Sequence, residues 1–375
     1  MIDHHYGIST RLFEPFFIDT LGKENLGILK IGHIAVISFF VLSGYVITWV
    51  LKNKYPHNSI GIKAFFLGRI IRIYPLYWAI FGAIVAAAFL IPGLKSAEEL
   101  ELLFSPWRLI GDFLLFPYGI AGFFLENNHY AYGMINLPAW TLPYDLVFYL
   151  VAPWMVMRKR ILGSIIGLEL LYLLFLSQIA AVPQYDKWHS EYLTTGHAQL
   201  LAFTIGAMAW YIRELRIPVW ALVSAIVFML YLVFVPYKLT NLYFNHLLVI
   251  LLTVVIILGL KKRSPLDNLL GELTYSTYLL HLPVFTLVAV LGINASSKSL
   301  AAVVLTYVIS IFVVKFIEAP IDKGRKFLTT ELLKTAKTLP EKTHTASVYI
   351  TVALFSFLLI SAGYNLYLVG YNASF

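Results

Sequence analysis

Two arginines three residues apart are the first candidates for chemistry in this chain. Arg69 and Arg72 stand in the stretch RIIRIYPLYW, which runs directly into an apolar segment. Residues three apart share one face of a helix, and a planar guanidinium binds phosphate through two parallel hydrogen bonds. The pair predicts either a phosphate site or a signal that orients the next span, because basic residues collect in cytoplasmic loops. The spacing alone leaves both interpretations open.

Ionisable residues inside apolar segments are a second kind of candidate. Asp145 lies in LPAWTLPYDLVFYLVAPW, His281 lies in LTYSTYLLHLPVF, and Glu169 lies within residues 161–182. A charged group at mid-membrane costs about 2.5–3.5 kcal/mol on translocon scales, so such residues mark functional sites by default. Other ionisable residues lie nearer segment ends, where we expect solvated side chains: His33, His197, His246 and Glu272.

The sequence DHH at residues 3–5 suggests acid–base chemistry. An imidazole titrates near neutral pH and can take the proton of a hydroxyl, while a neighbouring carboxylate fixes its tautomer. His4 and His5 are therefore candidate general bases. A metal site is the alternative interpretation, but no third ligand stands at a supporting spacing, and we expect no metal.

The composition places these residues in a membrane protein. Of 375 residues, 59% are hydrophobic and 13% are charged, whereas soluble domains have about 45–50% and about 25%. Apolar runs of roughly 20 residues suit α-helices that cross a hydrocarbon core of about 30 Å. The sequence has no cysteine, which excludes disulfides and an acyl-cysteine intermediate within it. Basic residues that orient helices explain the net charge of +8, and we expect no nucleic-acid binding.

Hydropathy and charge together predict an all-α polytopic transmembrane bundle with about ten crossings and one partial segment. The basic clusters collect on the cytoplasmic side only if one of two ambiguous stretches, 109–125 and 137–157, fails to cross. The first contains Asp112, Pro117 and glycines, so we expect it to be re-entrant or buried against the bundle. The expected spans are residues 31–51, 71–91, 137–157, 161–182, 197–212, 219–235, 243–260, 270–292, 299–317 and 347–370.

Five stretches, in this order, resemble the motifs of the integral-membrane acyltransferase 3 family, whose members acylate sugars and related acceptors. They lie within residues 32–328 and read GHIAVISFFVLSGYVI, RIIRIYPLYW, WTLPYDLVFYL, LTYSTYLLHLPV and IEAPIDKGRKFL. Asp145 stands where glutamate is commoner in the family. Glu318 and Arg325 belong to the last stretch, which resembles the family's closing structural motif.

The resemblance implies an acyl-CoA co-substrate, by default acetyl-CoA, that arrives from the cytoplasm, with no bound cofactor. Arg69 and Arg72 would hold its phosphates. Ser43 would line the passage for the pantetheine arm, and Gly44 beside it would allow a close approach between helices.

The resemblance also implies an acceptor hydroxyl that a histidine activates near the outer face. His4 would be this catalytic base, with His5 as the alternative, and Asp145 would orient a polar partner or the substrate. His281 would hydrogen-bond across the bundle, unless it is a structural histidine. Aromatic side chains would stack on a saccharide acceptor: Trp140, Tyr144 and Tyr149.

The front of the chain departs from the family pattern, in which a first helix opens on an arginine and ends on the catalytic histidine. Residues 1–30 contain neither a span nor a signal peptide. We therefore expect 1–30 to be a remnant of that helix and an external loop. The transmembrane domain follows at 31–328, then a cytoplasmic connection at 329–346 and an extra transmembrane helix at 347–375.

The sequence thus predicts a multi-pass protein, most simply of a bacterial inner membrane, that moves an acyl group from acyl-CoA to a hydroxyl of a cell-surface saccharide. Two alternatives stay open. A transporter or flippase of lipid-linked saccharides would also have a polar path, although the internal repeats of many transporters are not evident. A truncated, inactive acyltransferase is the other, because a displacement of 1 Å can cost about 100-fold in rate.

Overall fold

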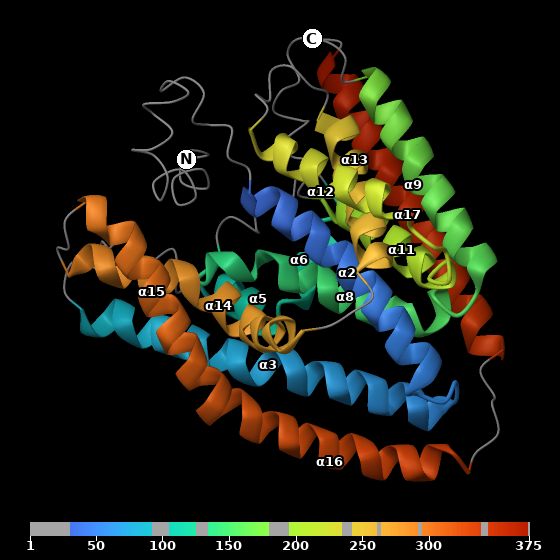
Figure 1. Cartoon of the computed structure of the whole chain (residues 1–375). Coiled ribbons are helices and arrows are strands. Elements are labelled where there is room, and N and C mark those ends of the chain that lie inside the picture. Colours follow the sequence, from blue (N-terminus) through green and yellow to red (C-terminus); the bar gives the residue numbers. More distant parts are fainter. Residues whose placement is uncertain are drawn as a thin grey trace.

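The computed structural model describes residues 31–91, 105–124, 134–179, 195–234, 242–260, 264–291, 295–338 and 344–373. Helices joined by short connections make up this part of the chain, and it contains no strand (Figure 1). The predicted catalytic residues His4 and His5 lie outside the described residues, as does the whole of the predicted segment 1–30.

A helix occupies each of the ten expected spans, which confirms the all-α bundle. By length and composition, six helical stretches of the described residues can span a membrane, and α12 and α13 are shorter apolar helices. The ten helices are α2 (Ile31–Asn53), α3 (Ser59–Leu90), α8 (Leu142–Met155), α9 (Lys159–Ile179), α11 (Gly196–Tyr211), α12 (Val219–Phe234), α13 (Leu242–Gly259), α14 (Pro265–Val290), α15 (Ala295–Val313) and α17 (His344–Ala373).

The stretch expected to cross only partly forms two short helices. α5 (Pro106–Leu114) and α6 (Phe116–Ala121) meet at Leu115, a non-glycine residue with a φ of 60°. At about 1.5 Å per residue, neither helix approaches the roughly 30 Å of a hydrocarbon core. A short 3₁₀ helix, η3 (Leu137–Thr141), then leads into α8.

Side chains of α3 donate hydrogen bonds to the last backbone carbonyl groups of α5. Tyr77 Oη donates to the carbonyl of Asp112 at 2.6 Å, and Trp78 Nε1 donates to that of Phe113 at 3.0 Å. The hydroxyl of Tyr74 donates to the next carbonyl. The last carbonyls of a helix have no intrahelical partner, and such groups need protein partners at membrane depth. These bonds therefore stabilise the break between α5 and α6.

α2 and α11 pack backbone against backbone. A Cβ atom added to Gly44 would lie 2.0 Å from the carbonyl oxygen of Phe203, and one added to Gly206 would lie 1.9 Å from that of Val41. Small residues that allow this approach are typical of packed transmembrane helices. The close contact expected at Gly44 is present, and α11 is the partner.

One long helical run joins α15 to the helix that lies along α3 (Figure 1). It passes through a π-helical turn, η6 (Val314–Glu318), into α16 (Ala319–Ala336). Asn58 connects the two ends: its Nδ2 donates to the carbonyl of Ala336 at 2.7 Å, and its Oδ1 accepts from Gly61 N at 2.9 Å. The predicted connection 329–346 is thus helical up to Ala336, and α3 begins at its capped position, twelve residues before the expected start.

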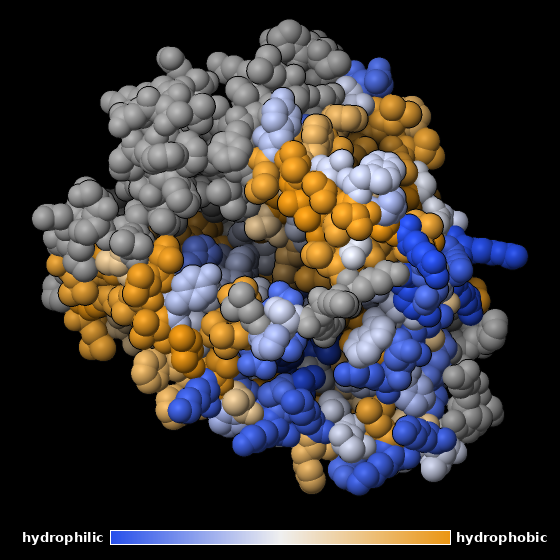
Figure 2. All heavy atoms as spheres, viewed as in Figure 1, coloured by the Kyte–Doolittle hydropathy of each residue, from blue (hydrophilic) through white to orange (hydrophobic). Residues whose placement is uncertain are grey.

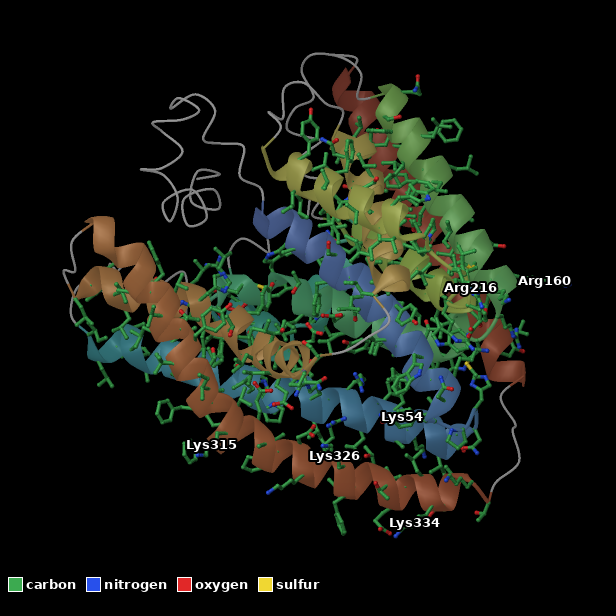
Figure 3. The ribbon with its side chains drawn as sticks, viewed as in Figure 1. Lys54, Arg160, Arg216, Lys315, Lys326 and Lys334 are labelled. Atoms are coloured by element: carbon green, nitrogen blue, oxygen red, sulfur yellow. The ribbon has the colours of Figure 1, made fainter. Side chains whose placement is uncertain are left out.

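Basic side chains gather on one side of the bundle. The labelled residues in Figure 3 lie along the lower and right-hand side of the view: Lys54, Arg160, Arg216, Lys315, Lys326 and Lys334. Figure 2 shows hydrophilic surface in the same region, with hydrophobic surface over the helices that flank it. This arrangement agrees with the predicted cytoplasmic face.

We predict that Gly44→Ala destabilises the protein by about 1–3 kcal/mol, because the new methyl group would force α2 away from α11. Thermal unfolding of the detergent-solubilised protein measures the effect. Gly167→Ala is the matched control, because nothing lies within 4 Å of its added Cβ in α9. Its expected effect is neutral or a gain of up to about 1 kcal/mol from helix propensity. Equal effects of the two substitutions would contradict the packing.

Candidate active site

Polar side chains from all five sequence motifs meet inside the bundle. Tyr275 connects them, because its hydroxyl lies within electrostatic reach of groups on α3, α8 and η6. We call this set the polar cluster; its members come from α2, α3, α8, α14 and η6, and are Ser43, Arg69, Arg72, Asp145, Tyr149, Tyr275, Tyr278 and Glu318.

Asp145 lies at the centre of the polar cluster and is only 2% exposed. Its Oδ1 accepts from Ser43 Oγ at 3.3 Å, and Tyr149, one turn later on the same face of α8, is a second hydrogen-bond partner. The guanidinium of Arg69 lies within electrostatic reach of the carboxylate. These partners offset the cost of burying a carboxyl group in an apolar bundle.

Arg69 has donor capacity that no protein group uses. Its guanidinium carbon lies 5.7 Å from the ring centre of Phe65 and 5.9 Å from that of Tyr149. The Nε atom is buried without a hydrogen-bond partner. A guanidinium presents five N–H donors in a fixed plane, so this position suits an anionic group that arrives from outside the protein.

Arg72 extends from the polar cluster towards the surface. Its Nη1 lies 3.2 Å from Glu318 Oε2, and the two side chains are 36% and 8% exposed. The ring centre of Tyr275 lies 5.8 Å from the guanidinium carbon of Arg72. The Tyr275 hydroxyl donates to the carbonyl of Ile73 at 2.7 Å. The π-helical turn η6 shifts the helical register at Glu318, a device frequent at functional sites.

A shallow crevice opens beside this ion pair. Arg72 and Glu318 line it together with two charged residues of α16, Asp322 and Arg325. Arg325 pairs with Asp322 on its own helix rather than with the polar cluster. The last sequence motif therefore brings one acidic group to the arginines of α3 and leaves its own arginine at the rim.

The predicted aromatic residues divide between the polar cluster and the core. Tyr149 belongs to the cluster, whereas Tyr144 is buried against α6 and contacts the Trp140 ring edge to face at 6.1 Å. His281 Nδ1 lies 2.7 Å from the carbonyl of Tyr278, one turn earlier on its own helix, rather than bonding across the bundle. A stacking role with a sugar ring therefore suits Tyr149 better than Tyr144.

The sequence analysis missed two tyrosines of the polar cluster, Tyr275 and Tyr278. The hydroxyl of Tyr278 lies 2.9 Å from Thr141 Oγ1 and also donates to the carbonyl of Pro138. Their spacing of three residues within LTYSTYLLH, the same as that of the arginines, is a signal that both point to one face.

His197 corrects an expectation of a solvated side chain. It is 1% exposed, with Nδ1 3.0 Å from Glu169 Oε2 and Nε2 2.9 Å from Ser361 Oγ. His246 is also buried, and its Nε2 lies 3.2 Å from the carbonyl of Ala198. Both lie in the first turns of their helices, and neighbouring helices cover them. The hydropathy of one segment does not show which other helices will pack over its side chains.

Hydrogen bonds give a structural role to the triad of Glu169 on α9, His197 on α11 and Ser361 on α17. Ser361 Oγ lies 2.9 Å from the carbonyl of Phe357, to which its hydroxyl donates. The same hydroxyl oxygen lies 2.9 Å from His197 Nε2, so Ser361 connects the imidazole to the backbone of α17. Because the Ser361 hydroxyl donates to a backbone carbonyl, its proton is not directed at the imidazole, and Ser361 is not poised as a nucleophile. Among the described residues, no group of three His, Asp or Glu side chains could hold a metal ion.

A family model described as an acyltransferase domain matches residues 4–317, most of the chain. The chain belongs to the acyltransferase 3 family. It is a multi-pass membrane protein. The matched residues include seven of the eight members of the polar cluster, and Glu318 directly follows them. Membership favours an acyltransferase over the transporter that the sequence left open.

The names of two relatives of this acyltransferase 3 chain refer to peptidoglycan and to exopolysaccharide. It is 29% identical to the peptidoglycan O-acetyltransferase OatA of Listeria monocytogenes over 80% of this chain and 53% of that protein. It is 27% identical to the exopolysaccharide production protein ExoZ of Rhizobium meliloti over 79% of this chain and 91% of that protein. The chain spans about half the length of OatA, and the match to the acyltransferase MdmB of Streptomyces mycarofaciens covers 35% of that protein. No solved structure matches.

We predict that His197→Ala destabilises this acyltransferase 3 protein by about 3–5 kcal/mol, because it leaves Glu169 buried without its partner. Ser361→Ala should cost less, about 1–3 kcal/mol, because it leaves one buried nitrogen of His197 without its hydrogen-bond partner. The double variant Glu169→Leu/His197→Leu should recover most of the loss, because well-packed apolar groups can replace a buried pair. Unfolding in detergent measures all three. A stable His197→Ala variant would show that the pair does not hold α11 against α9.

Proposed function

We propose that this protein transfers an acyl group, by default acetyl, from acyl-CoA to a hydroxyl of a cell-surface saccharide in a bacterial inner membrane. The observation that carries the proposal is the meeting of Arg69 and Arg72 with Asp145 in one buried polar cluster. The names of two relatives, a peptidoglycan O-acetyltransferase and an exopolysaccharide production protein, support the saccharide class.

The donor would bind through its phosphates at the two arginines. Arg69 has an unpartnered Nε, and Arg72 reaches the surface on a helix that begins at the basic side of the bundle. Each charge-assisted hydrogen bond to phosphate contributes about 1.5–3 kcal/mol. The surrounding positive charge would draw a polyanionic donor towards this side.

The reaction would be a direct transfer between the thioester and the alcohol. The acceptor oxygen attacks the thioester carbonyl and forms the ester bond, the carbon–sulfur bond breaks, and CoA leaves as a thiol. A general base takes the hydroxyl proton, and we propose His4, with His5 as the alternative. Asp145, hydrogen-bonded to Ser43 and Tyr149, would orient the polar groups that meet the acceptor.

We predict that Arg69→Ala and Arg72→Ala each raise the KM for acetyl-CoA about 10- to 100-fold, since 1.4 kcal/mol corresponds to a factor of ten. Initial rates of CoA release in membranes that contain the protein measure this effect. Arg160→Ala is the matched control: it removes a positive charge from the same side without touching the polar cluster, and its KM should not change. If the KM for acetyl-CoA is unchanged in both α3 variants, Arg69 and Arg72 do not form the donor site.

Asp145→Asn should lower kcat at least about tenfold, because the amide keeps the size of the side chain but loses the charge that orders its partners. Asp145→Glu should retain more activity than Asp145→Asn, because glutamate keeps the carboxylate. The same assay, with unfolding temperatures measured in parallel, checks this. Normal turnover of Asp145→Asn would make Asp145 a structural residue only.

A further inference from the structure

Three buried polar atoms near the break between α5 and α6 have no hydrogen-bond partner. They are Asp112 Oδ1 and the side-chain Oδ1 and Nδ2 of Asn136, on residues that are 0% and 1% exposed. Nearly all buried polar groups in native proteins are paired, and an unpaired one opposes folding. In a bundle that excludes water, such a group points to a partner that arrives separately.

The two side chains belong to one place in the fold. Asp112 Oδ2 accepts from Ile135 N at 3.0 Å, which puts the carboxyl group beside the residue that precedes Asn136. Tyr77 Oη holds the backbone of Asp112, and its ring belongs to the same apolar cluster as those of Tyr118 and Trp140. The carboxyl group of Asp112 thus lies beside the hydroxyl of Tyr118 and within electrostatic reach of Arg108.

This place continues the polar cluster on the side away from the basic surface. Asn136 lies two residues before Pro138, whose carbonyl accepts from Tyr278, and Tyr278 lies within electrostatic reach of Asp145. Along α3, Tyr77 follows Arg72 by five residues, about 7.5 Å further from the start of the helix. A ligand could therefore contact Asn136 while its reacting hydroxyl lies near Asp145.

We propose that Asp112 and Asn136 form a subsite that binds hydroxyl groups of the saccharide acceptor, an inference that rests on the proposed function. Each sugar hydroxyl both donates and accepts a hydrogen bond. A carboxylate oxygen accepts, and an amide does both, so the three free atoms match neighbouring hydroxyls of one ring. The aromatic side chains would contact the apolar face of that ring.

The decisive variant is Asn136→Leu, which removes two unpaired polar atoms and keeps the side-chain volume. The protein in membrane vesicles is given labelled acetyl-CoA, and two reactions are followed: its slow hydrolysis without acceptor, and acetyl transfer to chitotriose or cellotetraose. The expected result is a KM for the saccharide raised at least tenfold, with unchanged hydrolysis and an unchanged KM for acetyl-CoA. The unfolding temperature should stay equal or rise, because no protein hydrogen bond is lost.

A matched control removes a buried hydrogen-bond donor that lies outside the proposed subsite. Trp210→Phe deletes a buried, unpartnered Nε1 on α11, outside the polar cluster, and should change neither KM. Asp112→Asn keeps the shape of its side chain and should raise the saccharide KM in the same direction as Asn136→Leu.

Each outcome supports or overturns the subsite. An unchanged saccharide KM in Asn136→Leu would mean that these atoms do not bind the acceptor. Parallel loss of hydrolysis and transfer, with a lowered unfolding temperature, would mean a structural role. A third outcome is that the parent protein hydrolyses acetyl-CoA while these saccharides are neither acetylated nor inhibitory. This result would overturn a saccharide as the acceptor, but it would not affect the proposed donor site. Failure to turn over acetyl-CoA at all would instead refute the proposed function.

Discussion

The presence of two guanidinium groups against an apolar bundle, one with a buried Nε and one that extends to the surface, is the constraint on which the rest of the structure depends. A buried charge is stable only when it is paired or lies against polarisable groups. Arg72 has Glu318 from η6, and Arg69 has the rings of Phe65 and Tyr149 with Asp145 within electrostatic reach. The partners come from separate helices. The arginines can therefore keep their positions only if α3, α8, α14 and η6 pack together, and the site is inseparable from the fold.

α3 is the helix through which the parts are coupled. Asn58 caps the start of α3 and also donates a hydrogen bond to the last residue of α16. The middle of α3 carries the two arginines. In the following turns, tyrosine and tryptophan side chains donate hydrogen bonds to the last carbonyl groups of α5. A shift of α3 would thus alter the ion pair and the broken segment together. The backbone contact between α2 and α11 fixes the other wall, because Ser43 faces Asp145 while Gly44, next in sequence, touches α11.

The sequence was sufficient for features that depend on local composition. Runs of apolar residues predicted ten helices, and charge placement predicted the partial segment that α5 and α6 form. Features that depend on distant neighbours were not predictable in this way. α3 begins at Ser59 because Asn58 caps it, although Lys63 and the arginines depress hydropathy over its first turns. His197 is buried because α9 and α17 cover it, and the pairing of Glu318 with Arg72 joins residues 246 positions apart.

The unpaired polar atoms are informative because of where they lie. In a bundle surrounded by lipid, water cannot satisfy a stray donor or acceptor, so each one opposes folding. Five such atoms belong to Arg69, Asp112, Asn136 and Glu318. These residues follow the polar cluster from the crevice beside α16 to the broken segment between α5 and α6. Under the proposed function, these atoms would lower the stability of the empty protein and gain partners when the donor and the acceptor bind, the exchange expected at functional sites.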